Sequence, residues 1–161
     1  MLAAARSKAA LLAGRSASAR SLVSAIGHRA SVHSRRITSA TVPRAIPSSA
    51  SVQQADQLRQ EGKLYLDVRT KEEFAAAHVP DSINVPVFVA TPPQGMAPNP
   101  TFVQDVEAAI PDKTSEVLVG CAAGKRSAVA VSQLKAAGYA NLCDVEGGFN
   151  SWVGAGLPVT K

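Results

Sequence analysis

Residues 117–127 constrain the fold more than any other part of the sequence. Their first three residues form a short apolar run bounded by Gly120, a pattern typical of a buried strand in a parallel sheet. The run 127–137 is long enough for a helix, and Gly138 is placed to end it. The sequence therefore predicts a strand, a tight loop that begins at Cys121, and a helix.

The loop that begins at Cys121 is predicted to bind an anion. A chain that folds back over a cysteine at a helix start aims successive backbone N–H groups inward. These groups, the helix dipole and the nearby Lys125 and Arg126 favour the thiolate of Cys121, which is the nucleophilic form. Ser127 either donates its hydroxyl to the sulfur or caps the helix. The alternative interpretation is a buried cysteine that ends a core strand, with the basic residues facing solvent.

Strand and helix patterns alternate along the rest of the domain. Ser51 is a candidate cap for a helix over 52–60, and Thr70 with Glu73 forms a capping-box pattern before a second helix. The other predicted helices are 102–110 and 149–153, and the strands are 64–66, 83–85, 117–119 and 141–145. Residues 90–101 hold Pro92, Pro93, Pro98 and Pro100, and they predict a surface loop with little regular structure. The alternation predicts a parallel α/β sheet with helices on both faces, in which ligands bind beyond the carboxyl ends of the strands.

The basic charge of the chain lies in residues 1–50. The whole chain has 17 Lys and Arg and 12 Asp and Glu. Residues 1–50 hold eight of the basic residues and no acidic one, so the remaining part holds nine basic and twelve acidic residues. Arg is spread among Ser and Ala without a continuous apolar region, which is typical of a mitochondrial or chloroplast transit peptide. The alternative is a basic tail that binds nucleic acid or a membrane surface; we expect a disordered, cleaved targeting segment instead.

Several other classes of protein are disfavoured by the composition. No stretch of 18 or more apolar residues is present to span a membrane. After residue 50 the only histidine is His78, so we expect no metal site and no cofactor. Cys121 and Cys143 are too few for a disulfide scaffold, and we expect both to remain thiols in an organelle.

Three blocks of the sequence resemble the motifs of rhodanese domains, in the order found in that family. The opening block is residues 66–69, 73–74 and 78–86, the active-site block is residues 120–127, and the closing block is residues 138–139, 146–149, Trp152 and 156–159. Together they span about residues 52–158, which is nearly all of the predicted domain. The loop at 91–95 and the helix after it are most similar to the single-domain rhodaneses of plants and algae.

This resemblance implies a fold, a domain boundary and an activity. It implies one rhodanese domain over 51–161, with three α/β/α layers around a mostly parallel sheet. It also implies a thiosulfate sulfurtransferase in which Cys121 takes sulfur from thiosulfate or a related donor and holds it as a persulfide. A thiol such as thioredoxin or glutathione, or cyanide, would then accept the sulfur. The residues expected to bind the substrate are Ala122, Ala123, Gly124, Lys125, Arg126 and Ser127.

Two other functions remain open at this point. The related dual-specificity phosphatases have one residue more in this loop and usually a histidine before the cysteine, where this chain has Gly120. The shorter loop, six residues from Cys121 to Arg126, favours sulfur over phosphatase or arsenate reductase activity. The other alternative is a non-enzymatic persulfide carrier or redox-sensing module, which differs from the enzyme in its acceptor.

The remaining candidates receive structural interpretations. Asp67 and Arg69 are expected to form an ion pair that supports the active-site loop, and His78 to bond to backbone in a turn. Cys143 is expected in the core, with a resolving thiol for Cys121 as the alternative. We expect a monomer that binds neither nucleic acid nor membrane, in the chloroplast stroma or, as the alternative, the mitochondrial matrix.

Overall fold

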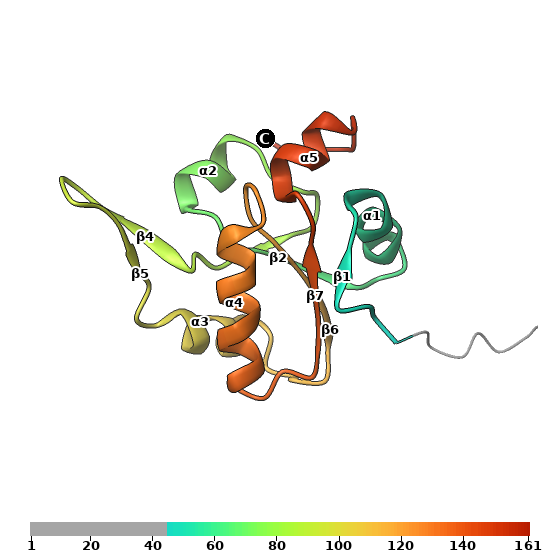
Figure 1. Cartoon of the computed structure of the whole chain (residues 1–161), viewed down its shortest axis with the longest axis horizontal. Helices are drawn as coiled ribbons and strands as arrows, with labels where there is room; N and C mark the ends of the chain where they lie inside the picture. Colours follow the sequence, from blue (N-terminus) through green and yellow to red (C-terminus); the bar gives the residue numbers. More distant parts are fainter. Residues whose placement is uncertain (1–44) are drawn as a thin grey trace, which may run out of the picture. The chain divides into compact units, whose positions relative to one another are not determined.

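A computed structural model describes residues 45–161, which contain a central sheet of five strands. The strands lie in the order β1-β7-β6-β2-β3, and every neighbouring pair is parallel (Figure 1). Their bounds are β1 Ser49–Ala50, β2 Leu64–Asp67, β3 Ile83–Asn84, β6 Glu116–Gly120 and β7 Asn141–Val145. The parallel α/β sheet that the sequence predicts is confirmed.

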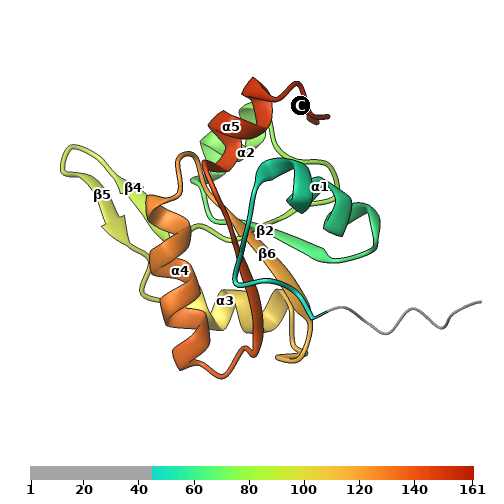
Figure 2. The same ribbon diagram turned by 45° about the vertical axis from the view of Figure 1, so that its right-hand side comes forward.

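Helices cover both faces of this sheet and make the three layers (Figure 2). One core contains Phe102 and Val106 of α3 (Phe102–Ala109) and Leu134 of α4 (Lys125–Ala136). The other contains Ala55 of α1 (Val52–Gln60) and Trp152 of α5 (Gly148–Gly154). Strand residues divide between the two cores by alternation, because successive side chains of a strand point to opposite faces. On β6, Val117 and Val119 belong to the first core and Leu118 to the second.

Two capping boxes fix the start of two helices, where the sequence predicts a cap at Ser51 and a capping box at Thr70 and Glu73. At α1, the Ser51 hydroxyl accepts from the Gln54 N–H, and the Gln54 side chain accepts from the Ser51 N–H. Thr70 and Glu73 make the same exchange at α2 (Lys71–Ala76). Each box satisfies two helix-end donors that would otherwise lack a partner.

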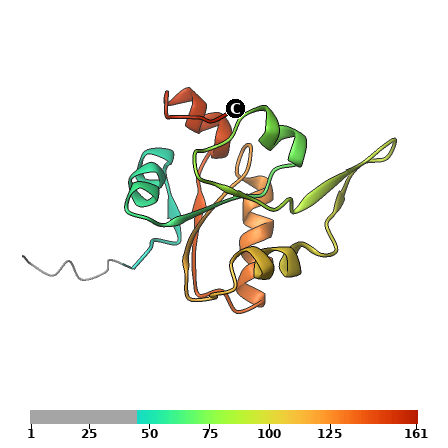
Figure 3. The same ribbon diagram turned by 180° about the vertical axis from the view of Figure 1, so that it is seen from behind.

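The predicted loop at 90–101 is a β-hairpin over much of its length. Strands β4 (Phe88–Thr91) and β5 (Gly95–Pro98) pair antiparallel, and the hairpin projects from the rest of the domain (Figures 1 and 3). Pro92 and Pro93 lie in the turn, and Pro98 ends a strand. Both strands of a two-stranded sheet are edges, where proline is tolerated. The prediction of an irregular loop is therefore wrong for this segment, because its prolines are compatible with the turn and the edge strands of a hairpin.

The sheet begins before Ser51, where the sequence analysis placed the start of the domain. β1 precedes that residue, Ala50 is buried, and Ile46 packs against the core around Trp152. The Asp144 N–H donates to the Ser48 carbonyl at 3.0 Å. The targeting segment predicted for residues 1–50 lies outside the described residues as far as residue 44. None of the helices in residues 45–161 is long and apolar enough to cross a membrane.

Candidate active site

Cys121 directly follows β6 at the carboxyl edge of the sheet. Its side chain is buried, with an exposed fraction of 2%. Gly124 has a φ of 91° and is the N-cap of α4. This left-handed conformation favours glycine and turns the chain sharply into the helix. The helix begins at Lys125, two residues before its predicted start, so the loop between strand and helix is only four residues long.

The Cys121 sulfur has two polar neighbours from its own loop. The Gly124 N–H donates to Sγ at 3.0 Å, and the Ser127 Oγ lies 3.5 Å from Sγ. The Ser127 hydroxyl donates to the Gly124 carbonyl at 3.0 Å, and its side chain is fully buried. Neither predicted role of Ser127 is seen: its hydroxyl accepts from the Cys121 sulfur instead of donating to it, and Gly124 occupies the N-cap.

Other N–H groups of the loop and of the first turn of α4 make no hydrogen bond. Within residues 45–161, no hydrogen bond uses the backbone N–H of Ala122, Ala123, Lys125, Arg126 or Ser127. Those of the last three belong to the first turn of α4, where the helix leaves donors without internal partners. Together with the positive end of the helix dipole, they stabilise negative charge near the sulfur.

Helix α5 holds the loop from the other side. The Phe149 N–H donates to the Cys121 carbonyl at 2.7 Å, and the Asn150 N–H donates to the Ala122 carbonyl at 3.0 Å. Gly148 sits so close that a Cβ there would collide with the Cys121 carbonyl oxygen. These contacts occupy the carbonyl groups of Cys121 and Ala122.

The expected ion pair of Asp67 and Arg69 is present and buried. The guanidinium donates to the carboxylate through Nε at 3.0 Å and Nη2 at 2.7 Å, and also to the Ala77 carbonyl. It lies 3.9 Å over the centroid of the Phe149 ring. The pair therefore supports the segment of α5 that bonds to the loop. His78 bonds to the Phe74 carbonyl and stacks on its ring, as expected of a turn residue.

Glu73 is a site residue that sequence reasoning missed. Its carboxylate accepts two hydrogen bonds from Arg126, at 2.6 and 2.8 Å. The hydrogen bond from Arg126 lowers the pKa of Glu73 to about 2, and Glu73 in turn raises the pKa of Arg126. The capping-box pattern accounts for Glu73 locally, and no local signal joins it to a residue 53 positions away. Lys125 is exposed and makes no ion pair with any described residue.

Cys143 lies on the other side of the sheet from Cys121. It belongs to the core with Leu118 and Trp152, whereas Cys121 belongs to the core of α3 and α4. Both residues are free thiols. Burial raises the pKa of the Cys143 thiol to about 11, and the charges of Asp144 and Glu146 add to this. The expected core position is confirmed, and the geometry gives no support to Cys143 as a resolving thiol.

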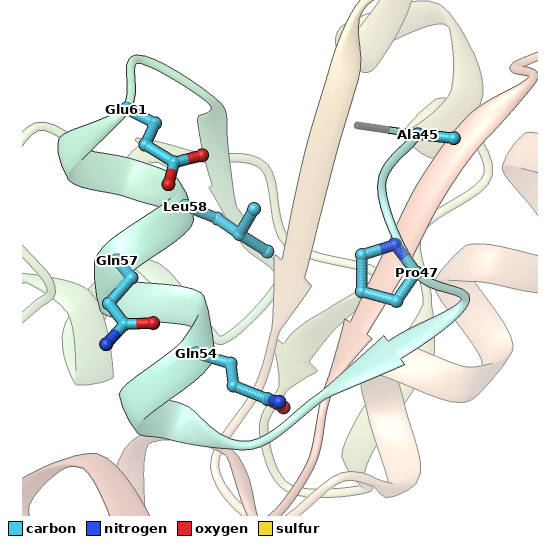
Figure 4. A pocket seen from close by; sticks show the side chains of 6 residues that line it. All are labelled: Ala45, Pro47, Gln54, Gln57, Leu58 and Glu61. Atoms are coloured by element: carbon cyan, nitrogen blue, oxygen red, sulfur yellow. The ribbon is translucent and has the colours of Figure 1, made fainter. Parts of the chain in front are cut away.

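Two cavities of the described residues lie away from the sulfur, and Cys121 lines neither of them. One, of about 210 Å³, lies between α1 and the chain before β1 and is lined by Ala45, Pro47, Gln54, Gln57, Leu58 and Glu61 (Figure 4). A second, of about 190 Å³, lies between the start of α2 and the base of the hairpin. Within residues 45–161, no cluster of three or more His, Cys, Asp or Glu side chains could hold a metal ion.

This geometry defines a class of α/β domains that carry a cysteine on a short loop at the sheet edge. A family model for the rhodanese-like domain matches residues 51–155, and the chain belongs to this family of sulfurtransferases and related domains. The predicted family membership and fold are therefore confirmed.

Individual relatives agree with the family assignment. The chain is 40% identical over 113 residues to thiosulfate sulfurtransferase 16, chloroplastic, of Arabidopsis thaliana, an alignment that covers 70% of this chain and 92% of that protein. It is 39% identical over 100 residues to protein HIGH ARSENIC CONTENT 1, mitochondrial, of the same plant, covering 62% of this chain and 58% of that protein. The crystal structure of a rhodanese-related protein from Thermoplasma volcanium is similar with a TM-score of 0.56 and 28% identity, over 71% of this chain and 98% of that one.

Proposed function

We propose that this protein is a thiosulfate sulfurtransferase that works through a persulfide on Cys121. The observation that carries the proposal is the loop itself, in which a buried sulfur receives the Gly124 N–H, while five backbone N–H groups of residues 122–127 make no hydrogen bond within the described residues. A thiosulfate sulfurtransferase name among the relatives supports the same donor.

The first half-reaction transfers one sulfur atom. The Cys121 thiolate attacks the outer sulfur of thiosulfate, the S–S bond of thiosulfate breaks, and sulfite leaves with the electron pair. The product is a Cys121 persulfide with one negative charge on its outer sulfur. Preorganised N–H donors stabilise such a charge without having to reorient. Ala122, Ala123, Gly124 and the first turn of α4 supply these donors, and Lys125 attracts the anionic donor.

The second half-reaction returns Cys121 to its starting state. An acceptor thiolate, such as that of glutathione or a thioredoxin, attacks the outer sulfur of the persulfide. A new persulfide forms on the acceptor as the bond to Cys121 breaks, and the Cys121 thiolate is released. Cyanide would react in the same way and leave as thiocyanate.

Sulfur transfer is supported over phosphate chemistry by the space around Gly120. A Cβ at this position would collide with the hydroxyl end of Tyr65. The related phosphatases usually carry a histidine at this position, and Tyr65 leaves no room for one. The six-residue span from Cys121 to Arg126 also gives a smaller cradle than the phosphatase loop.

For localisation, we propose the chloroplast stroma, with the mitochondrial matrix as the alternative. The basic composition of residues 1–50 supports an organelle, and the relatives include one named chloroplastic and one named mitochondrial. A fluorescent fusion of residues 1–51 tests this, and cytosolic fluorescence would contradict it.

The mechanism is tested by intact-protein mass spectrometry of the full chain after incubation with thiosulfate. We expect the gain of one sulfur atom on Cys121 with release of one sulfite, followed by loss of that sulfur when cyanide or glutathione is added. Folded protein that gains no sulfur would refute the proposal. A Cys121 persulfide that forms but passes its sulfur only to a protein acceptor would favour the non-enzymatic persulfide carrier.

A further inference from the structure

Of the two basic side chains that follow the Cys121 loop, one has an ion-pair partner and the other has none within the described residues. Arg126 is paired with Glu73 through both Nη atoms, at 2.6 and 2.8 Å. Lys125, one residue earlier, is exposed and has no ionic partner within residues 45–161. The loop thus carries two cations, but Glu73 cancels one of them and leaves a single uncompensated positive charge.

The Glu73 carboxylate is held in this position by more than the arginine. It also accepts from the Thr70 N–H at 3.1 Å, as part of the capping box of α2. Because its pKa is lowered to about 2, the carboxylate stays ionised over the whole range in which the protein would act. The negative charge of Glu73 therefore offsets the positive charge of Arg126 throughout this pH range.

The net charge of the side chains near the Cys121 sulfur, which an incoming sulfur donor experiences, depends on the pairing of Arg126 with Glu73. Thiosulfate is a dianion, and it approaches a sulfur that must itself be a thiolate to react. An organic thiosulfonate presents the same outer sulfur on a group of similar shape, with one negative charge fewer. The two donors therefore respond differently to any change in the charge of the loop, because the interaction energy scales with the charge of the donor.

We propose that Glu73 is a specificity-determining residue that shifts the site away from dianionic donors and toward singly charged sulfane-sulfur donors of the thiosulfonate class. This deepens the proposed function and depends on it. The chemistry is the same for both donors: with a thiosulfonate, the Cys121 thiolate attacks the terminal sulfur, the S–S bond breaks, and a sulfinate leaves with the electron pair. The Cys121 persulfide is the common product.

The test is the selectivity ratio between thiosulfate and methanethiosulfonate in the full chain. The rate constant for persulfide formation at low donor concentration is measured for each donor by rapid quench and mass spectrometry. Comparing the ratio among variants removes the intrinsic reactivity of the donors. Glu73→Gln keeps the capping box, because Gln54 fills the same role at α1. We expect it to raise the ratio of thiosulfate to methanethiosulfonate about 3- to 10-fold, and less at high salt.

Charge variants of the neighbouring residues separate electrostatics from a structural role. Arg126→Gln and Lys125→Gln each remove one positive charge and should lower the ratio. The double variant Glu73→Gln/Arg126→Gln has the net charge of the natural loop, so its ratio should return to that of the natural protein. Lys135→Gln, in the last turn of α4, is the matched control and should not change the ratio.

Each outcome either supports or overturns the inference. A ratio that follows the net charge across these variants supports it, even where a variant lowers both rates. A ratio unchanged in Glu73→Gln, or not restored in the double variant, overturns it while leaving the proposed function intact. Failure of the natural protein to form a persulfide with either donor refutes the proposed function as well.

Discussion

Cys121 directly follows β6 and Cys143 lies on the neighbouring β7, and the two cysteines differ in almost everything but burial. Cys121 has an exposed fraction of 2% and Cys143 of 0%. The Cys121 sulfur receives a backbone N–H at 3.0 Å and lies beside open donors at a helix start, whereas the Cys143 side chain is enclosed by apolar groups of the second core. Burial raises the pKa of the Cys143 thiol to about 11, so about one molecule in a thousand carries the thiolate at pH 8. The comparison teaches that the donors around a buried sulfur, and not its burial, decide whether it is a candidate nucleophile.

Replacing each cysteine in turn gives the largest expected contrast. Cys121→Ser should abolish persulfide formation from thiosulfate, because it removes the attacking sulfur. Cys143→Ser should form the persulfide at the natural rate and lose about 1–3 kcal/mol of stability, since a hydroxyl enters an apolar core. Intact mass and thermal unfolding measure the two effects. Persulfide on Cys143 in the Cys121→Ser protein would break the comparison.

Disturbing the contacts from α5 to the Cys121 loop should have the second-largest effect on persulfide formation. In Gly148→Ala, the new Cβ pushes against the Cys121 carbonyl, so we expect persulfide formation to slow at least about 10-fold as the N–H groups of the loop lose their alignment. Gly156→Ala is the matched control, because Gly156 also has a positive φ, 69°, but open space around it. It should cost about 1 kcal/mol of stability and leave the rate unchanged. Equal rate losses in both variants would show that strain alone, and not the loop contact, is responsible.

Removal of β1 should expose Cys143 to alkylation and leave the alkylation of Cys121 unchanged. β1 pairs with the strand that carries Cys143, and Ala50 belongs to the same core. Removal of residues 1–50 deletes the hydrogen bonds from Asp144 to Ser48 and from Glu146 to Ala50, at a cost of about 2 kcal/mol. We expect iodoacetamide to alkylate Cys143 faster in this protein than in one that lacks only residues 1–44. The alkylation rate of Cys121 should be the same in both, and equal protection of Cys143 would contradict the prediction.

The elements around Cys121 were predictable because their signals are local. A short apolar run, a glycine-bounded loop and a helix of fixed length place Cys121 at the sheet edge, and Ser51 and Thr70 mark helix starts by chemistry within four residues. The carboxylate partner of Arg126 was not predictable, because the ion pair joins α2 to α4, which are 53 positions apart at these residues. The hairpin at 88–98 was missed because its pairing is weakly encoded among prolines.

The position of β1 also has a consequence for the order of assembly. Within residues 45–161, the first strand of the sheet in sequence, β1, pairs only with β7, the last one, so the two meet across nearly the whole described domain. Such a pairing closes a long loop and forms slowly compared with local contacts. During synthesis, β1 cannot pair until β7, which ends at Val145, has been made. The edge of the sheet that β1 forms is therefore completed last.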